Sequence, residues 1–160
     1  MAIPNTFTNG TVADADDVME NLNYVNPIVH QVYTGTDLNV STSGGTDENS
    51  LELTAITAAD LANKQYIKIS YLQQLANTTG VVGLYWKIQV KETGGAYADK
   101  LAEQLITNQI DTGNHQLIWY YTLTAGDLTN GCQVKIFVKA TGAGTSGGST
   151  VQLVQEVIGG

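Results

Sequence analysis

An alternation of apolar and polar residues with a period of two constrains the fold of this chain more than any other feature. Between positions 84 and 91 every second residue is apolar, namely Leu84, Trp86, Ile88 and Val90. The same pattern recurs over 67–71 and 134–138. Because successive side chains of a strand point to opposite faces, these segments predict antiparallel strands with one packed face and one wet face. Glycine-rich turns separate them, so we expect an all-β protein, an antiparallel β-sandwich of jelly-roll-like form.

Size and charge narrow the class of protein further. The chain has 160 residues, which suits one sandwich domain and its attachments. All seven basic residues are lysines and the net charge is −8, so we expect no nucleic-acid partner, since such binding relies on arginine forks and positive patches. The single cysteine, Cys132, excludes an intrachain disulfide and a Cys-x-x-Cys site. No segment is apolar enough to span a membrane and residues 1–25 lack a signal-peptide pattern, so we expect no membrane partner.

The chain divides into two parts. Residues 1–26 are expected to form an extended arm followed by a short helix over 13–22, and residues 27–160 the sandwich. The stripe of Val18, Leu22 and Val25 is too narrow to hold a short helix alone, so it must dock on something. Gly142–Gly148 is predicted to be a flexible loop before a last strand over 151–158. Residues 97–106 fit either a helix or a strand.

A short segment, Thr-Ala-x-Asp-Leu, occurs at 57–61 and again at 124–128. A threonine followed three residues later by an aspartate predicts a single helical turn that begins with a capping box. We expect the leucine of each copy to be buried. We also expect each turn to carry the chain from one sheet of the sandwich to the other.

Catalytic and metal-binding patterns do not stand out in the sequence. His30 and His115 are far apart along the chain, and neither has metal-ligand spacing. We therefore predict a protein that is not an enzyme, with no catalytic, cofactor-binding or metal-binding residues and no cofactor.

Aromatic residues are the remaining candidates for a binding surface. Trp86 and Trp119 lie on alternating strands and are assigned to the core or its border. Three others are predicted to point outward and to form a surface aromatic platform: Tyr85, Tyr120 and Phe137. Such a platform serves either as an interface with another subunit, which we favour, or as a glycan-binding site.

Residues 3–18 read Ile-Pro-Asn-Thr-Phe-Thr-Asn-Gly-Thr-Val-Ala-Asp-Ala-Asp-Asp-Val. They resemble a segment near the start of many tailed-bacteriophage virion proteins, among them tail fibres, head fibres and decoration-type appendages. That segment has Pro-Asn-x-Phe, a Gly-Thr turn, Ala-Asp-Ala and then a helix. This chain departs from it at 19–22, where Met-Glu-Asn-Leu stands in place of Asn-x-Asn-Phe. The resemblance implies attachment and trimerisation through Ile3, Pro4, Phe7, Val12, Val18, Leu22 and Val25.

The expected function follows from the sandwich and the resemblance together. We expect a structural protein of a tailed-phage virion, a capsid decoration or head-fibre protein anchored by its arm, because 160 residues leave no room for a fibre shaft. The alternative is a tail-fibre or tail-tip module that binds a receptor or carbohydrate. The expected partners are further copies in a homotrimer, other virion proteins and, in the alternative, a host-surface glycan. The expected location is the virion, assembled in the host cytoplasm.

Overall fold

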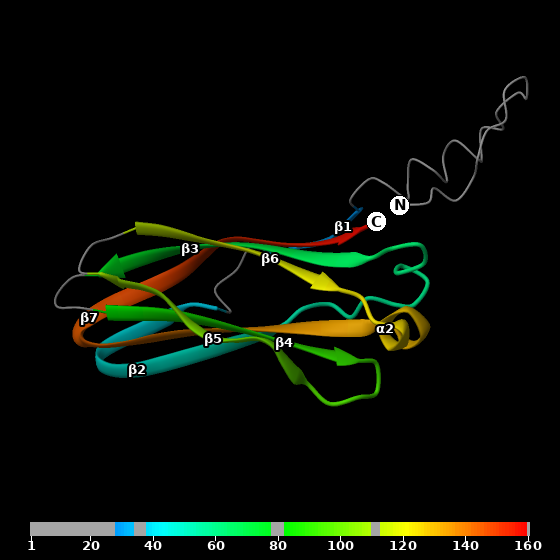
Figure 1. Cartoon of the computed structure of the whole chain (residues 1–160). Coiled ribbons are helices and arrows are strands. Elements are labelled where there is room, and N and C mark those ends of the chain that lie inside the picture. The colour runs from blue at the N-terminus through cyan, green and yellow to red at the C-terminus, as the bar shows by residue number, and fades with distance from the viewer. Residues whose placement is uncertain (1–27, 34–37, 78–81, 110–112, 160) are drawn as a thin grey trace, which may run out of the picture.

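A computed structural model of the chain describes residues 28–33, 38–77, 82–109 and 113–159 (Figure 1). It contains one short helix and seven strands among these residues, and every strand pair is antiparallel. The predicted arm and helix of residues 1–26, with all seven attachment residues, lie outside the described residues. The elements are β1 (Ile28–Tyr33), β2 (Val40–Glu52), β3 (Tyr66–Asn77), β4 (Val82–Glu92), β5 (Ala98–Gln109), β6 (Gly113–Thr122), α2 (Ala125–Asn130) and β7 (Cys132–Ile158).

Strand β7 belongs to both layers of a sandwich. Its first half, up to Gly142, lies between β4 and β2. Its second half, from Ser146, pairs with β3 on one side and, on the other, with the first residues of β2 and then, near its end, with β1. One layer is therefore β5-β4-β7-β2, here the β4 sheet, and the other is β6-β3-β7-β1, here the β3 sheet. Figure 1 shows β7 curving from one layer into the other. With its two halves counted separately there are eight strands, in the order of a jelly roll, so the predicted fold is confirmed.

The bend in β7 corrects one prediction. Residues 142–148 are strand, not a flexible loop, because Gly142 pairs with Gly45, and residues 145–148 pair with the start of β2. Glycines without side chains allow a strand to bend sharply where it changes sheets, and the same glycines are typical of loops in a sequence. The choice left open at 97–106 is settled as strand from Ala98 onward, since β5 pairs with β4 there.

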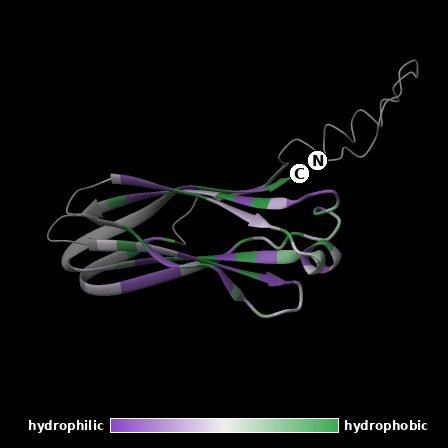
Figure 2. Ribbon diagram, viewed as in Figure 1, coloured by the Kyte–Doolittle hydropathy of each residue, from purple (hydrophilic) through white to green (hydrophobic). Residues whose placement is uncertain are grey.

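The core lies between the inner faces of the two sheets, and apolar and polar residues alternate along the strands (Figure 2). Trp86 is fully buried, as predicted, and packs edge-to-face on Tyr71 with ring centroids 5.7 Å apart. Its indole N–H donates to Oε1 of the buried Gln73 (3.3 Å), so burial leaves no unpaired donor there. Trp119 is partly buried at the border of the core. Burial raises the pKa of the Cys132 thiol to about 12.

The repeated segment forms the same turn twice. Between β2 and β3, the Thr57 hydroxyl donates to Asp60 Oδ2 (2.7 Å) and the Asp60 N–H donates to Thr57 Oγ1 (3.3 Å). Between β6 and β7, the matching distances for Thr124 and Asp127 are 2.8 and 3.1 Å, and Thr124 is the N-cap of α2. Each turn joins one sheet to the other at the same end of the sandwich (Figure 1), which confirms the prediction.

The two turns differ in which residue they bury. Leu61 is fully buried, as predicted, and its neighbour Asp60 is exposed. In the second copy Asp127 is buried, and Leu128 is 41% exposed, so the prediction of a buried leucine is wrong there. The reason is that the Tyr121 hydroxyl donates to Asp127 Oδ2 (2.8 Å) from inside the sandwich, and this contact turns the aspartate inward and the next residue outward.

Candidate interaction surfaces

The outer face of the β4 sheet gathers most of the positive charge of the chain. Strands β4 and β7 place Tyr85 opposite Lys139 and Lys87 opposite Phe137, so lysines and rings alternate across the two strands. Four of the seven lysines lie on this face of a chain whose net charge is −8. We name it the lysine–aromatic face, and its members are Tyr85, Lys87, Lys91, Tyr97, Lys135, Phe137 and Lys139.

The ammonium groups of these lysines lie over the rings. Lys87 Nζ is 4.0 Å from the centroid of Phe137, and Lys139 Nζ is 4.6 Å from that of Tyr85. Lys91 Nζ lies 4.4 Å from the centroid of Tyr97. Each such contact stabilises by about 0.5–1 kcal/mol at an exposed site. The rings are therefore half-buried supports for cations on this face.

Acidic residues at the margins neutralise part of this charge. Lys135 pairs with Glu52 of β2 (3.5 Å), and Lys139 is hydrogen-bonded to Glu103 of β5. Burial, and then the negative charge of Glu52, raises the pKa of the Tyr97 hydroxyl to about 12. Within the described residues neither Lys87 nor Lys91 has an ion pair, so their charge is available to a partner.

A glycine makes room for one of the rings. Tyr85 lies across Gly83, two residues earlier on the same face of β4, where a Cβ would come within 2.9 Å of the ring. Any larger residue at this position would push the ring away, so the ring position depends on Gly83.

The predicted aromatic platform is split between two faces. Tyr85 and Phe137 lie together on the lysine–aromatic face. Tyr120 lies on the outer face of the other sheet, opposite Lys68 of β3, and is 57% exposed. Alternation within each strand indicated that all three point outward, but it carries no information on which sheet a strand joins.

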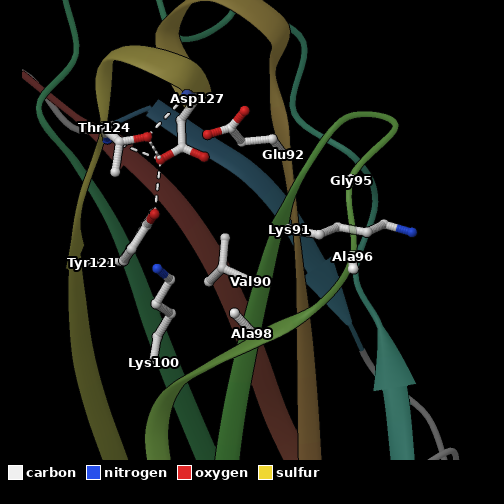
Figure 3. Close-up of a pocket in the computed structure, with 10 residues that line it drawn as sticks. All are labelled: Val90, Lys91, Glu92, Gly95, Ala96, Ala98, Lys100, Tyr121, Thr124 and Asp127. Atoms are coloured by element: carbon white, nitrogen blue, oxygen red, sulfur yellow. Dashed lines mark hydrogen bonds between the residues drawn. The ribbon is translucent and has the colours of Figure 1, made fainter.

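A pocket of about 290 Å³ opens at the α2 end, between the β4–β5 turn and the start of α2 (Figure 3). At its inner wall Asp127 Oδ2 accepts hydrogen bonds from the Tyr121 hydroxyl (2.8 Å), the Thr124 N–H (2.9 Å) and the Thr124 hydroxyl (2.8 Å). Burial, and then the hydrogen bond to Asp127, raises the pKa of Tyr121. The Lys100 ammonium lies 5.6 Å from the centroid of the Tyr121 ring.

This arrangement uses the buried carboxylate to hold the turn together. All three donors meet the same oxygen of Asp127, and two of them belong to the residue that caps α2. The repeat marked Asp127 as a capping residue, but its contact with the Tyr121 side chain, from the end of the preceding strand β6, lies outside the repeated segment and was not predicted.

In the part of the chain that the structure describes, no group of three or more His, Cys, Asp or Glu side chains is placed to hold a metal ion. No helix in the same part is long and apolar enough to cross a membrane.

Comparison with known proteins gives similarity at the level of structure alone. No family model and no curated protein matches the chain. A chain in the structure of infectious bursal disease virus, Gx strain, superposes with a TM-score of 0.51 and 15% identity, over 98% of this chain and 37% of the viral one. Tailspike protein 4 of bacteriophage CBA120, described as an enzymatically active domain, gives a TM-score of 0.49 and 10% identity, over 82% and 19%. The xylan-binding domain CBM22-1 of Paenibacillus barcinonensis Xyn10C gives 0.45 and 16%, over 85% and 81%.

The viral match bears on the fold. It covers nearly all of this chain and little more than a third of the viral chain, so the likeness is to one part of a larger protein. At 15% identity it supports the β-sandwich architecture derived above and no more.

Proposed function

We propose that this chain is a structural subunit of a virion and, within that class, a capsid decoration or head-fibre protein of a tailed bacteriophage. The observation that carries the proposal is the complete jelly roll, eight strands in two sheets, which extends from β1 to the end of β7. Jelly rolls are common in viral capsid and lectin domains. The match over 98% of the chain to part of a virus structure supports the first of these uses.

In the proposed arrangement the two parts of the chain have separate tasks. The N-terminal arm, through the segment that resembles phage attachment segments, anchors three copies to other virion proteins. The sandwich is then displayed outward. A net charge of −8 is repelled by nucleic acid, which favours a position outside the capsid over one against the genome.

Carbohydrate binding is the competing function, and the lysine–aromatic face bears on it. A sugar ring stacks on an open aromatic face, whereas the rings of Tyr85 and Phe137 carry lysine ammonium groups at 4.6 and 4.0 Å. Stacking there would first have to displace those cations. The covered rings therefore favour a protein partner over a neutral glycan on this face.

Antibody labelling of intact particles tests the proposal. Antibody against the sandwich, with gold-labelled second antibody, is applied to particles of the phage that encodes the chain and viewed by electron microscopy. Label distributed over the capsid is the expected result. Label confined to the tail tip would favour the receptor-binding alternative, and particles that contain no copy of the protein would overturn the virion assignment.

Removal of the arm tests the division of tasks. A variant that lacks residues 2–12 should keep the melting temperature of the full chain but fail to join particles. Normal incorporation of this variant, or loss of its fold, would show that the segment is not an anchor. A glycan array probed with the full chain is the companion measurement, and specific binding there would support the alternative.

A further inference from the structure

The four edge strands of the sandwich are not equally protected. Strands β2 and β5 are charged, with Asp47, Glu48 and Glu52 on one and Asp99, Lys100 and Glu103 on the other, and β5 pairs with β4 through three register shifts. Strand β1 is only six residues long and has a register shift of its own. Charges, short length and bulges are the devices that stop an exposed edge from pairing with another chain.

Strand β6 has none of these devices. Its ten residues, Gly113–Thr122, include no Asp, Glu, Lys or Pro, and they pair with β3 without a register shift. Within the described residues its other edge pairs with no strand. A long, regular, uncharged edge is a template for a further strand.

The side chains of β6 are also unusually apolar for an exposed strand. On the outer face Ile118 is 52% exposed and Tyr120 is 57% exposed. On the inner face Leu117 and Trp119 are only partly buried, although both pack against the core. Both faces of the strand therefore carry apolar area that another strand alongside would cover.

We propose that β6 pairs with β6 of a second copy, antiparallel, around a two-fold axis at Trp119. In that register Ile118 lies opposite Tyr120 of the second copy, and Tyr120 lies opposite the second copy's Ile118. In an antiparallel pair, the outer faces of the two strands lie on the same side only when the numbers of opposite residues add to an even number. Among the registers that meet this condition, no other one gives both Ile118 and Tyr120 an apolar partner. An aromatic ring opposite a β-branched side chain is a favourable cross-strand pair.

A second copy fits this edge better than a charged partner does. The strand has no charged group to attract one, and at the joint two chains of net charge −8 meet through residues that carry no charge. The pairing would join two β3 sheets into one continuous sheet. The β6 pairing therefore predicts assemblies with an even number of chains, and assemblies of six chains where the arm also forms trimers. This proposal stands apart from the virion assignment, because either can fail alone.

The first test compares two matched substitutions. Ile118→Glu places a charge on β6, and Leu105→Glu places one on edge strand β5, where Leu105 is 50% exposed. Light scattering after size exclusion at 100 µM should give an even-numbered assembly for the wild type and for Leu105→Glu, and half that mass for Ile118→Glu. A thermal melt checks that both variants fold. A wild-type monomer or plain trimer, or an unchanged mass for a folded Ile118→Glu variant, would overturn the proposal.

The second test reads the register and does not require a destabilising change. The variants Ile118→Cys and Tyr120→Cys are made separately, mixed in equal amounts and oxidised under mild conditions. Non-reducing electrophoresis should show a covalent dimer from the mixture at several times the yield of either variant alone, since only unlike copies face each other in this register. Equal yields from the mixture and from the single variants, or no dimer at all, would contradict it. The native Cys132 is buried and does not compete.

Discussion

Replacing Asp127 by alanine should destabilise the protein much more than the same change at Asp60, although the two residues occupy equivalent places in the repeat. Asp60 is exposed and its hydrogen bonds stay within its own turn, with Thr57. A capping residue of this kind contributes about 0.5–2 kcal/mol to stability. We expect the Asp60→Ala change to cost that amount.

The cost at Asp127 has a second component. The carboxylate is 1% exposed, and its Oδ2 accepts from the Tyr121 hydroxyl as well as from Thr124. Alanine removes the carboxylate half of the capping box and also leaves the buried Tyr121 hydroxyl without its acceptor, which costs about 1–3 kcal/mol more. The expected total is about 1.5–5 kcal/mol. For a chain of this size each kcal/mol corresponds to about 2–4 °C, so the melting temperature should fall by roughly 3–20 °C.

A double-mutant cycle separates the two components. The Tyr121→Phe change removes the donor, so in the double variant no hydroxyl is stranded and the combined loss should be smaller than the sum of the single losses by about 1–3 kcal/mol. Urea unfolding followed by circular dichroism gives the four free energies of unfolding. Equal losses for Asp60→Ala and Asp127→Ala, or simple additivity in the cycle, would refute the reasoning.

Three further outcomes are expected. The Gly94→Ala change should cost about 1–2 kcal/mol of stability because the φ of Gly94 is +82°. The Gly131→Ala change, at φ +78°, should cost more because the new Cβ would lie 2.5 Å from a backbone oxygen. Denaturant unfolding of both variants gives the two losses. The Cys132 thiol, whose pKa burial raises to about 12, should not react with a thiol reagent at pH 8 until the protein is unfolded. The raised pKa of Tyr97 means that the folded state favours the protonated hydroxyl. The stability that this protonated hydroxyl contributes should therefore be complete below pH 10 and should be lost as the pH rises to about 12. The Glu52→Gln change should lower that pKa, as measured by alkaline absorbance against a Tyr97→Phe reference.

The fold could be predicted because its strongest signal is local. In β4 the apolar residues stand at every second position, and all of them are buried in the structure, from Leu84 to Val90. The same holds for Val134, Ile136 and Val138 in β7. A period of two fixes both the element and the buried face, so two packed sheets follow from the sequence. The capping turns were predictable for the same reason, since Thr and Asp three residues apart meet within one turn.

The errors arose where the outcome depends on tertiary contacts that lie outside the local pattern. The glycines at 142–148 are typical of a loop, but pairing with β2 and β3 makes them part of a strand. The leucine of the second repeat is exposed because Tyr121, near the end of the preceding strand β6, draws Asp127 inward. Tyr120 parts from Tyr85 and Phe137 because β6 joins the other sheet. None of these contacts leaves a trace in residue spacing.

The free edge of β6 and the lysine–aromatic face suit different partners, and the topology keeps them apart. Strand β6 belongs to the β3 sheet, whereas the lysine–aromatic face lies on the β4 sheet. A two-fold joint through β6 would therefore leave the lysine–aromatic face open on both copies, with Lys87 and Lys91 free of ion pairs within the described residues. A subunit of a particle needs both kinds of surface, one for its own copies and one for other components. On this argument Ile118→Glu should abolish self-association and leave the lysine–aromatic face intact. Replacing Lys87 and Lys91 should leave self-association unchanged and weaken binding of other components to that face.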